Sequence, residues 1–195
     1  MVNERIALLH LFDFTFGLEI VFYQVNPVAN GVHFFSINNL RLEYLLVRKM
    51  IQIAHRGNFA GRNKERENTL SYLNEAIDAG YDVEVDVWVI DGKFFLGHDG
   101  PEHPITIWDL LQIEEHSWFH AKNYEAFVEL LKHELHVFFH DKDEYTLTSH
   151  GVIWAYSGKF VNEYAIACMP EMTEGFEVPE NAMGVCSDNL KPTVS

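Results

Sequence analysis

Short apolar segments typical of β-strands alternate with helical segments from residue 50 to the end of the chain. Residues 51–54 and 81–89 have strand composition, and residues 67–80 between them carry apolar residues three or four positions apart, up to Gly80. Such alternation predicts a parallel sheet, open or closed, with helices as crossover connections. In sheets of this kind the functional side chains gather at the carboxyl ends of the strands.

The rest of the chain continues this pattern with fewer helices. The further segments are a hairpin at 90–100, helices at 106–113 and 124–133, and strands at 117–123, 135–140, 151–156, 164–169 and 182–187. A TIM-type β/α barrel takes about 250 residues, and the segment 50–195 is much shorter. We therefore expect an α/β fold of this type, a TIM-type β/α barrel that is abbreviated, with several crossovers reduced to loops.

Residues 1–49 do not follow the pattern. They mix turn residues with short apolar pieces, and Asp13 interrupts the one apolar stretch that resembles the centre of a signal peptide. No small-residue cleavage motif follows that stretch. We expect residues 50–195 to be the natural barrel domain and residues 1–49 to be an atypical N-terminal extension or a wrongly assigned start.

Charge and apolar content restrict the partners. The formal net charge is −15, and the whole negative excess lies in residues 50–195. An acidic surface repels nucleic acid but suits a divalent cation. No apolar run reaches the about 18 to 20 residues of a membrane-spanning helix, so we expect no transmembrane segment. Nothing in the sequence indicates an oligomeric state.

The chain has two cysteines, Cys168 and Cys186, without a CxxC motif or zinc-finger spacing. Both lie within apolar runs, as buried reduced thiols do. This favours a reducing compartment, and we expect a cytoplasmic location.

The residues after the first strand allow two interpretations. His55 and Arg56 could be a solvated turn, with Gly57 supplying an unusual backbone angle and Asn68 or Thr69 capping the following helix. Alternatively, this strand end is the edge of an active site.

The second strand carries Glu84 and Asp86, which point to the same face because one residue separates them. They could form the solvent-exposed face of an edge strand. On a buried strand the two carboxylates would repel each other strongly unless a cation joined them. His55 and His98 each lie at a predicted strand or hairpin end and precede a charged residue. Histidine gives and accepts protons near neutral pH.

Taken in order, these segments resemble a known family. The set is "HRG" at 55–57, "ENT" at 67–69, "EVD" at 84–86, and "HD" at 98–99. It is similar to the glycerophosphodiester phosphodiesterase family, which is related to phosphatidylinositol-specific phospholipase C. The similarity is clear over residues 51–100 and fainter beyond, where "GVCSD" resembles the family's last strand.

The resemblance implies a β/α barrel that hydrolyses phosphodiesters with one divalent metal at its mouth. By position, His55 and His98 would be the general acid and base. Arg56 would neutralise phosphate charge in catalysis and substrate binding, and Lys122 would contact the phosphate.

The resemblance also implies a metal site. Glu84 and Asp86 would be ligands, and Glu67 would be a further ligand or would orient His55. His120 stands where the family has a third ligand, a glutamate. Either His120 ligates through its imidazole, or two carboxylates and water hold the metal. Carboxylates suit Mg²⁺ or Ca²⁺, whereas an imidazole ligand shifts the preference towards Mn²⁺, Co²⁺ or Zn²⁺.

We expect hydrolysis of a small phosphodiester such as a glycerophosphodiester. The alternatives are a lyase or phospholipase D-type reaction on lysophospholipids, and a barrel that binds metal or phosphate without catalysis. Trp154 and Tyr156 share a face and would serve as core or as a stacking surface for substrate. His140 and Asp141 would line the pocket or form a solvated turn. Asp188 would support the barrel or a catalytic group.

Overall fold

The computed structural model describes residues 50–191 in full and, of the segment before them, only five short strands. The chain divides into two compact units, residues 1–48 and 49–195. The expectation that residues 1–49 are an extension falls largely outside the described residues and stays a prediction.

The first unit contains antiparallel strand pairs. β1 (Ile6–Leu8) pairs with β4 (Phe22–Val25), which pairs with β5 (Val32–Phe35). β2 (Asp13–Phe14) pairs with β3 (Gly17–Leu18).

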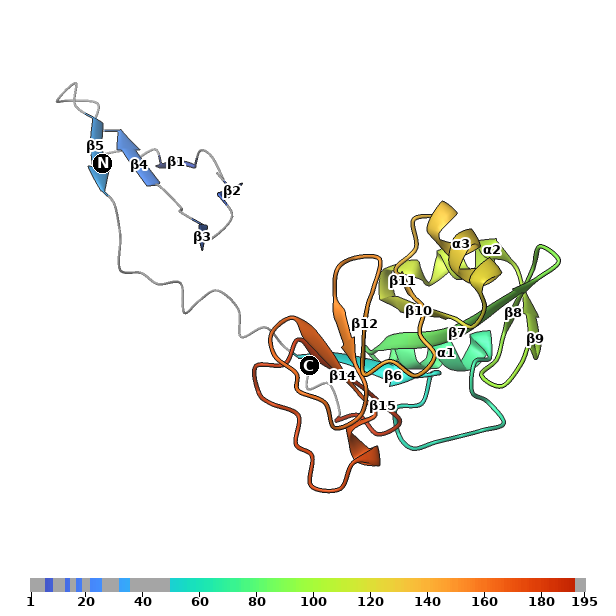
Figure 1. Cartoon of the computed structure of the whole chain (residues 1–195). Helices are drawn as coiled ribbons and strands as arrows, with labels where there is room; N and C mark the ends of the chain where they lie inside the picture. The colour runs from blue at the N-terminus through green and yellow to red at the C-terminus, as the bar shows by residue number, and fades with distance from the viewer. Residues whose placement is uncertain are drawn as a thin grey trace. The chain divides into compact units, whose positions relative to one another are not determined.

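A mixed sheet organises the second unit (Figure 1). Its strand order is β11-β10-β7-β6-β15-β14-β13-β12, parallel except for the last pair. The strands on this path are β6 (Ile51–His55), β7 (Asp82–Ile90), β10 (Ser117–Ala121), β11 (Val137–Phe138), β12 (Tyr145–Leu147), β13 (Ile153–Ala155), β14 (Ala165–Cys168) and β15 (Gly184–Ser187).

A hairpin extends the sheet beyond β7. Asp91 and Gly92 both have positive φ, 50° and 72°, as a two-residue turn between twisted antiparallel strands requires. The chain then forms β8 (Lys93–Leu96) against β7 and β9 (His103–Ile105) against β8. The predicted hairpin is confirmed. The strand β9 was not expected, because its central residue is a proline, which is restricted to edge strands.

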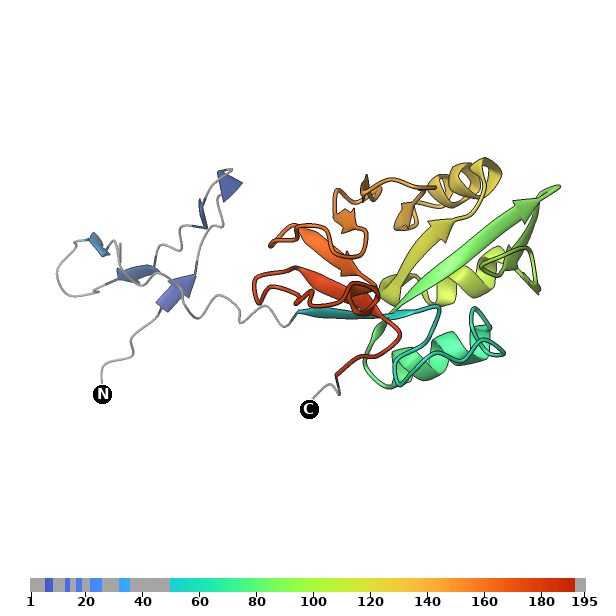
Figure 2. The ribbon, with the colours of Figure 1, turned by 60° about the horizontal axis from the view of Figure 1, so that its bottom comes forward.

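The helices α1 (Leu70–Asp78), α2 (Ile107–Gln112) and α3 (Tyr124–Lys132) gather around β6, β7 and β10 (Figure 2). Thr106 and Asp109 form a reciprocal capping box on α2, and Asn123 caps α3. Apolar residues of the helices and of the convex face of the sheet form one buried core. Its main members are Ala54, Leu73, Ala76, Val83, Val85, Val87, Leu110, Phe119, Ala121, Ala126, Leu130 and Val137.

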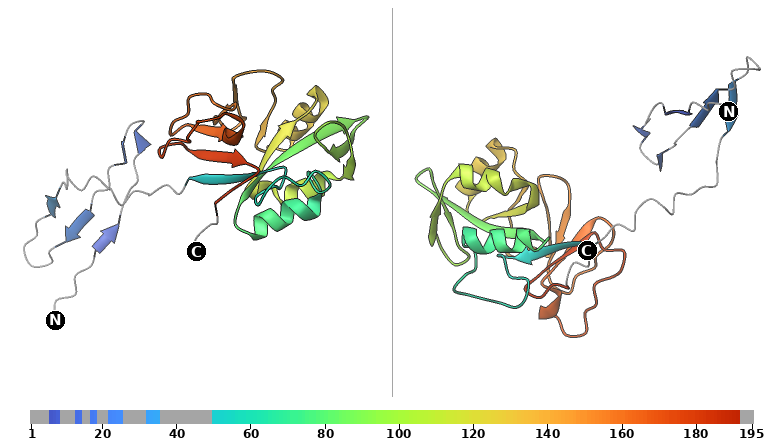
Figure 3. Two further views of the ribbon diagram at one scale, coloured as in Figure 1. Left: turned by 90° about the horizontal axis from the view of Figure 1, so that it is seen from below. Right: turned by 180° about the vertical axis from the view of Figure 1, so that it is seen from behind.

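The other half of the sheet, β13 to β15, is flanked by loops and by the 3₁₀ helix η2 (Pro170–Met172), as Figure 3 shows. A second 3₁₀ helix, η1 (Glu114–His116), lies between α2 and β10. Small side chains replace a helical layer here. The buried residues of this outer cluster are Ala155, Val161, Ala165, Ala167 and Ala182.

The sheet curls so that its other face encloses a second core. Ile53, Trp118, Phe138, Trp154, Ile166 and Cys186 come from six strands and pack together there. Among the described residues, β11 and β12 form no ladder. Ser149 instead bridges the gap, because its backbone N donates to O of Val137 (2.8 Å) and its Oγ accepts from N of Val137 (3.0 Å).

The fold is therefore α/β, with a curled mixed sheet and few helices. This confirms the α/β class and the reduction of crossovers to loops. The expectation of a TIM-type β/α barrel is corrected in one respect: the described residues do not complete such a barrel. Its helical layer stops after α3, and the antiparallel strand β12 ends the sheet where a further parallel strand would close it.

Both cysteines are free thiols, Cys186 buried and Cys168 half-buried. They are register partners on the adjacent strands β14 and β15. No helix in the part of the chain that the structure describes has the length and apolar character needed to cross a bilayer.

Candidate functional site

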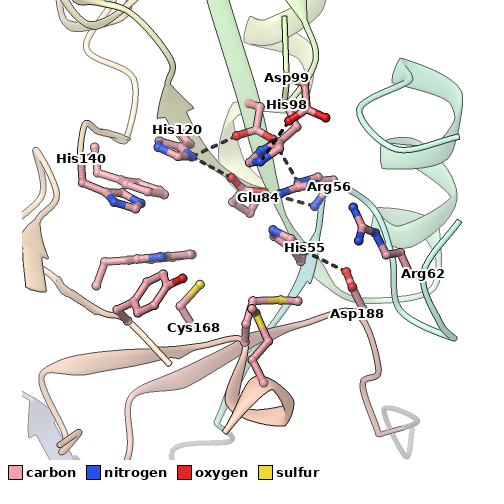
Figure 4. Close-up of a pocket in the computed structure, with 16 residues that line it drawn as sticks. His55, Arg56, Arg62, Glu84, His98, Asp99, His120, His140, Cys168 and Asp188 are labelled. Carbon is pink, nitrogen blue, oxygen red and sulfur yellow. Dashed lines mark hydrogen bonds and ion pairs between the residues drawn. The ribbon is translucent and has the colours of Figure 1, made fainter. Parts of the chain in front are cut away.

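The turn after β6 is fixed against β7 (Figure 4). Arg56 and Gly57 have φ of 56° and 87°, so two successive residues adopt left-handed backbone. A side chain at position 57 would place its Cβ 3.0 Å from Cδ1 of Tyr72. The backbone N of Arg56 donates to both O (3.1 Å) and Oε2 (3.2 Å) of Glu84. The interpretation of a solvated turn is therefore wrong, because Arg56 is buried and the turn is bonded to β7.

The segment before α1 holds residues of the site in place and contributes little to capping the helix. Thr69 is the N-cap residue but its side chain makes no capping bond. Nδ2 of Asn68 donates to Oδ2 of Asp86 (2.9 Å), and Oδ1 of Asn68 accepts from the backbone N of Asp86 (3.0 Å). Asn68 adopts φ of 58°, a region that asparagine tolerates. Its role is to hold the carboxylate of Asp86, which the capping prediction missed.

The carboxylate of Glu67 lies among arginines. Its oxygens accept from Nη1 of Arg56 (3.1 Å) and from Nε of Arg62 (2.8 Å). Nδ2 of Asn58 donates to Oε1 of Glu67 (3.2 Å) and to Oδ1 of Asp188 (2.9 Å). Burial opposes the charge, but the hydrogen bonds outweigh burial and lower the pKa of Glu67 to about 2. Glu67 lies outside the candidate metal cluster and supports the two arginines instead.

Glu84, Asp86 and His120 form a candidate metal cluster on the concave face of the sheet. One ligand atom from each lies within 4.8 Å of the others, and all three residues are buried. β10 pairs with β7 so that His120 is directly opposite Asp86. The one-residue spacing of Glu84 and Asp86 turns both carboxylates to the same face. The parallel register then brings the imidazole to them, which the sequence alone could not show.

The cluster suits a divalent cation by its chemistry. Two carboxylates and one imidazole are a donor set found with borderline and hard cations. Nε2 of His120 is buried without a hydrogen bond among the described residues. Nδ1 of His120 lies 3.0 Å from Oδ1 of Asp86 and 3.4 Å from Oε1 of Glu84. A cation between these atoms would have to displace the proton on Nδ1.

The two carboxylates strongly affect the pKa of His120. Burial alone would lower the pKa of His120, but hydrogen bonds and charges from Asp86 and Glu84 outweigh burial and raise it to about 9. Without a metal, the imidazole is therefore a cation at neutral pH. If a metal bound here, the ligating imidazole would be neutral and the cation itself would supply the positive charge.

Three further basic side chains surround the carboxylate of Asp86. Its carboxylate lies 3.2 Å from Nε of Arg56, 3.2 Å from Nδ1 of His98 and 3.3 Å from Nζ of Lys122. Burial would raise the pKa of Asp86, but the hydrogen bonds from His120 and His98 hold it well below its usual range. Nζ of Lys122 also lies 3.3 Å from Nδ1 of His98. Lys122 therefore faces Asp86 and His98.

A glycine defines the loop that carries His98. Gly97 has φ of 146°, and a Cβ there would lie 2.2 Å from O of Gly100. Its carbonyl oxygen accepts from Nε1 of Trp88 (2.7 Å), which fixes the loop to β7. These constraints place His98 beside Asp86 at the mouth of the site.

His55 is oriented by the last strand. Nδ1 of His55 lies 2.9 Å from Oδ1 of Asp188, directly after β15. Burial would lower the pKa of His55, but the bond with Asp188 and the charge of Glu84 raise it above its ordinary value. The backbone N of Asp188 donates to Oε1 of Glu171 (3.0 Å). Asp188 thus positions the imidazole of His55, which agrees with the expectation that it would support a catalytic group.

One cavity of about 370 Å³ joins these groups. The predicted site residues that line it are His55, Arg56, Glu84, Asp86, His98 and His120. Lys122 and Glu67 are not among the lining residues. Arg62 lines the cavity and was not predicted. No local pattern indicates Arg62, because it lies in an irregular segment.

His140 also lines the cavity, as one of its two interpretations predicted, whereas Asp141 does not. The ring of His140 stacks on that of His120 at 4.6 Å and 3°. Burial and the nearby charges of His120 and Lys122 lower the pKa of His140 to about 4. Its imidazole is therefore neutral where that of His120 is charged.

No family model matches this chain, and comparisons with curated proteins and with solved structures find no match either. The functional inference consequently depends on the motif residues and their geometry.

Proposed function

We propose that this protein is a metal-dependent phosphodiesterase that hydrolyses a phosphodiester such as a glycerophosphodiester. The observation that carries the proposal is that His55 and His98 line the same cavity as the candidate metal cluster. The resemblance to the glycerophosphodiester phosphodiesterase family gives these same residues joint roles.

The two histidines differ in a way that suits general acid–base catalysis. The contact of Nδ1 of His55 with Asp188 leaves Nε2 as the nitrogen for proton transfer to or from substrate. His98 is half-exposed at the mouth and contacts Asp86 through Nδ1. One histidine would activate the attacking hydroxyl or water, and the other would protonate the leaving alkoxide.

Positive charge in the cavity would stabilise the phosphoryl group. Arg56 and Arg62 line the cavity, and Glu67 holds both guanidinium groups in place. We assign the phosphate contact to these arginines. Lys122 is a positioning residue for His98 and Asp86, because it does not line the cavity.

Glu84, Asp86 and His120 would hold the divalent cation. When bound, it supplies charge stabilisation for a phosphoryl oxygen. The imidazole in the donor set favours Mn²⁺, Zn²⁺ or Co²⁺ over Mg²⁺ and Ca²⁺.

The test is hydrolysis of bis(p-nitrophenyl) phosphate and of glycerophosphocholine with Mg²⁺, Mn²⁺, Ca²⁺ and Zn²⁺ in turn. We expect activity with at least one metal, and a loss of about 10²- to 10⁴-fold in His98→Ala, the range that a general acid or base contributes. His103→Ala is the matched control, because His103 is half-exposed like His98 but lies outside the cavity.

Activity that survives His98→Ala would overturn the role of His98. A wild-type chain that is inactive with all four metals would overturn the proposed enzymatic activity and favour a binding module. Calorimetry with Mn²⁺ and inorganic phosphate would identify such a module. Phosphorus NMR of the product separates hydrolysis from formation of a cyclic phosphate.

A further inference from the structure

The cavity has two walls of different chemistry. One carries the charged groups described above, from β6, β7, β10 and the loop after β8. The other comes from β11, β13, β14 and η2. It consists of Phe138, Trp154, Tyr156, Cys168, Met169 and Met172. Figure 4 shows this division, with Cys168 and His140 lying away from Arg56 and Arg62.

The base of this apolar wall is rigid. The rings of Phe138 and Trp154 stack at 4.5 Å, and Trp154 also packs on Trp118 at 5.8 Å. Phe138 and Trp154 are buried in the concave core. The wall is therefore formed before any ligand binds.

The rim of the wall is also held in place but remains open. Met169 adopts φ of 47°, and its backbone N donates to O of Cys186 (2.7 Å). Oγ of Ser157 donates to O of Met169 (2.8 Å). Tyr156 and Met172 are nevertheless 50% and 64% exposed. Contiguous exposed apolar patches mark ligand-binding surfaces, and these two side chains continue the apolar lining of the cavity.

The wall contains no lysine, arginine, aspartate or glutamate. Over most of this wall the hydroxyls of a small polar substituent such as glycerol would face carbon and sulfur atoms, which offer few hydrogen-bond partners and so cost binding energy. An apolar substituent would lose water from its surface without such a cost. The charged wall of the same cavity already accounts for the phosphate.

We propose that the apolar wall receives one ester substituent of the substrate, a bulky apolar alkyl or aryl alcohol. This rests on the proposed function, since the phosphate must lie at the charged wall. Tyr156 and Met172 are then specificity-determining residues, and the preferred diester joins one apolar alcohol to one small polar alcohol.

The test uses three diesters of glycerol phosphate with ethanol, hexanol and 2-phenylethanol, at concentrations below any aggregation. Cleavage is followed by phosphorus NMR, and bis(p-nitrophenyl) phosphate reports whether the chain has phosphodiesterase activity. We expect kcat/KM for the hexyl or the phenylethyl diester to exceed that for the ethyl diester by at least about ten-fold. The two apolar diesters distinguish an alkyl from an aryl preference.

Tyr156→Ala and Met172→Ala should each reduce the ratio of hexyl or phenylethyl to ethyl turnover at least about three-fold, since each removes part of one apolar surface. Tyr164→Ala is the matched control, because Tyr164 is also exposed, at 61%, but lies outside the cavity, and its ratio should equal that of the wild type. Equal kcat/KM for all three diesters, with bis(p-nitrophenyl) phosphate still cleaved, overturns this inference alone. Cleavage of none of the four compounds overturns the proposed function.

Discussion

The two halves of the sheet differ in both their support and their chemistry. β6, β7 and β10 are covered by three helices and carry His55, both acidic ligand candidates and His120. β13 to β15 are short and are flanked by loops with small side chains, and β13 and β14 carry much of the apolar wall, together with β11 and η2. Charged groups that must be held at fixed distances thus lie on the well-packed half. Contacts with the substrate's substituent lie where side chains are more exposed.

The ion pairs of Asp86 lie in the helix-covered half, and Asp86→Asn should have the largest effect on stability. The change leaves the buried Arg56 and His120 and the half-buried Lys122 beside a neutral amide. We expect a loss of about 3 to 5 kcal/mol in the free energy of unfolding, as for breaking other buried ion pairs, measured by urea denaturation. Asp99→Asn is the control, because the side chain of Asp99 is 94% exposed. A loss shared by both variants would contradict the special role of Asp86.

Packing should differ between the halves in the same direction. Leu73 of α1 is fully buried against the sheet, whereas Leu147 of β12 is 66% exposed. We expect Leu73→Ala to lower the free energy of unfolding by about 2 to 5 kcal/mol. Leu147→Ala should change it by less than about 0.5 kcal/mol. Both values come from the same denaturation series. Similar losses would mean that the loop-flanked half is packed as firmly as the other.

The smallest expected effect is the pH dependence that His120 gives to the metal-free protein. Its pKa is raised from 6.5 to about 9 in the folded chain. A raised pKa contributes stability that is complete below about pH 6.5 and is lost as the pH rises through about 9. Between pH 7 and 9 the loss should be about 2 kcal/mol, measured in chelator-treated buffer. His120→Gln should remove this pH dependence, and an unchanged slope would contradict the assignment.

Local patterns were sufficient to predict most strands and all three helices between residues 50 and 133. Alternating apolar residues and the Asp91–Gly92 turn gave β7 and β8 directly. The strand β9 was missed because its central residue is a proline, and β12 because its three residues carry no strong period. Glu84 and Asp86 were placed on one face correctly, since one-residue spacing in a strand has only one geometric consequence.

The contacts that complete the site could not be predicted in this way. Asn58 and Asn68 carry no signal beyond turn preference, yet they hold Asp188 and Asp86. Trp154 and Tyr156 were expected on one face, but only the fold shows one buried in the concave core and the other at the rim of the cavity. Such roles depend on which residues from distant strands meet.

Short-range periodicity was enough to predict the α/β class, the strands that carry His55 and His120, and the shared face of the two carboxylates. The bond of Asp188 to His55 across 133 positions of chain, and the cover of helices over half of the sheet in residues 50–191, follow from the folded arrangement. That arrangement also decided that an apolar wall faces the charged one. These depend on register and curl, which set the distances between residues remote in sequence.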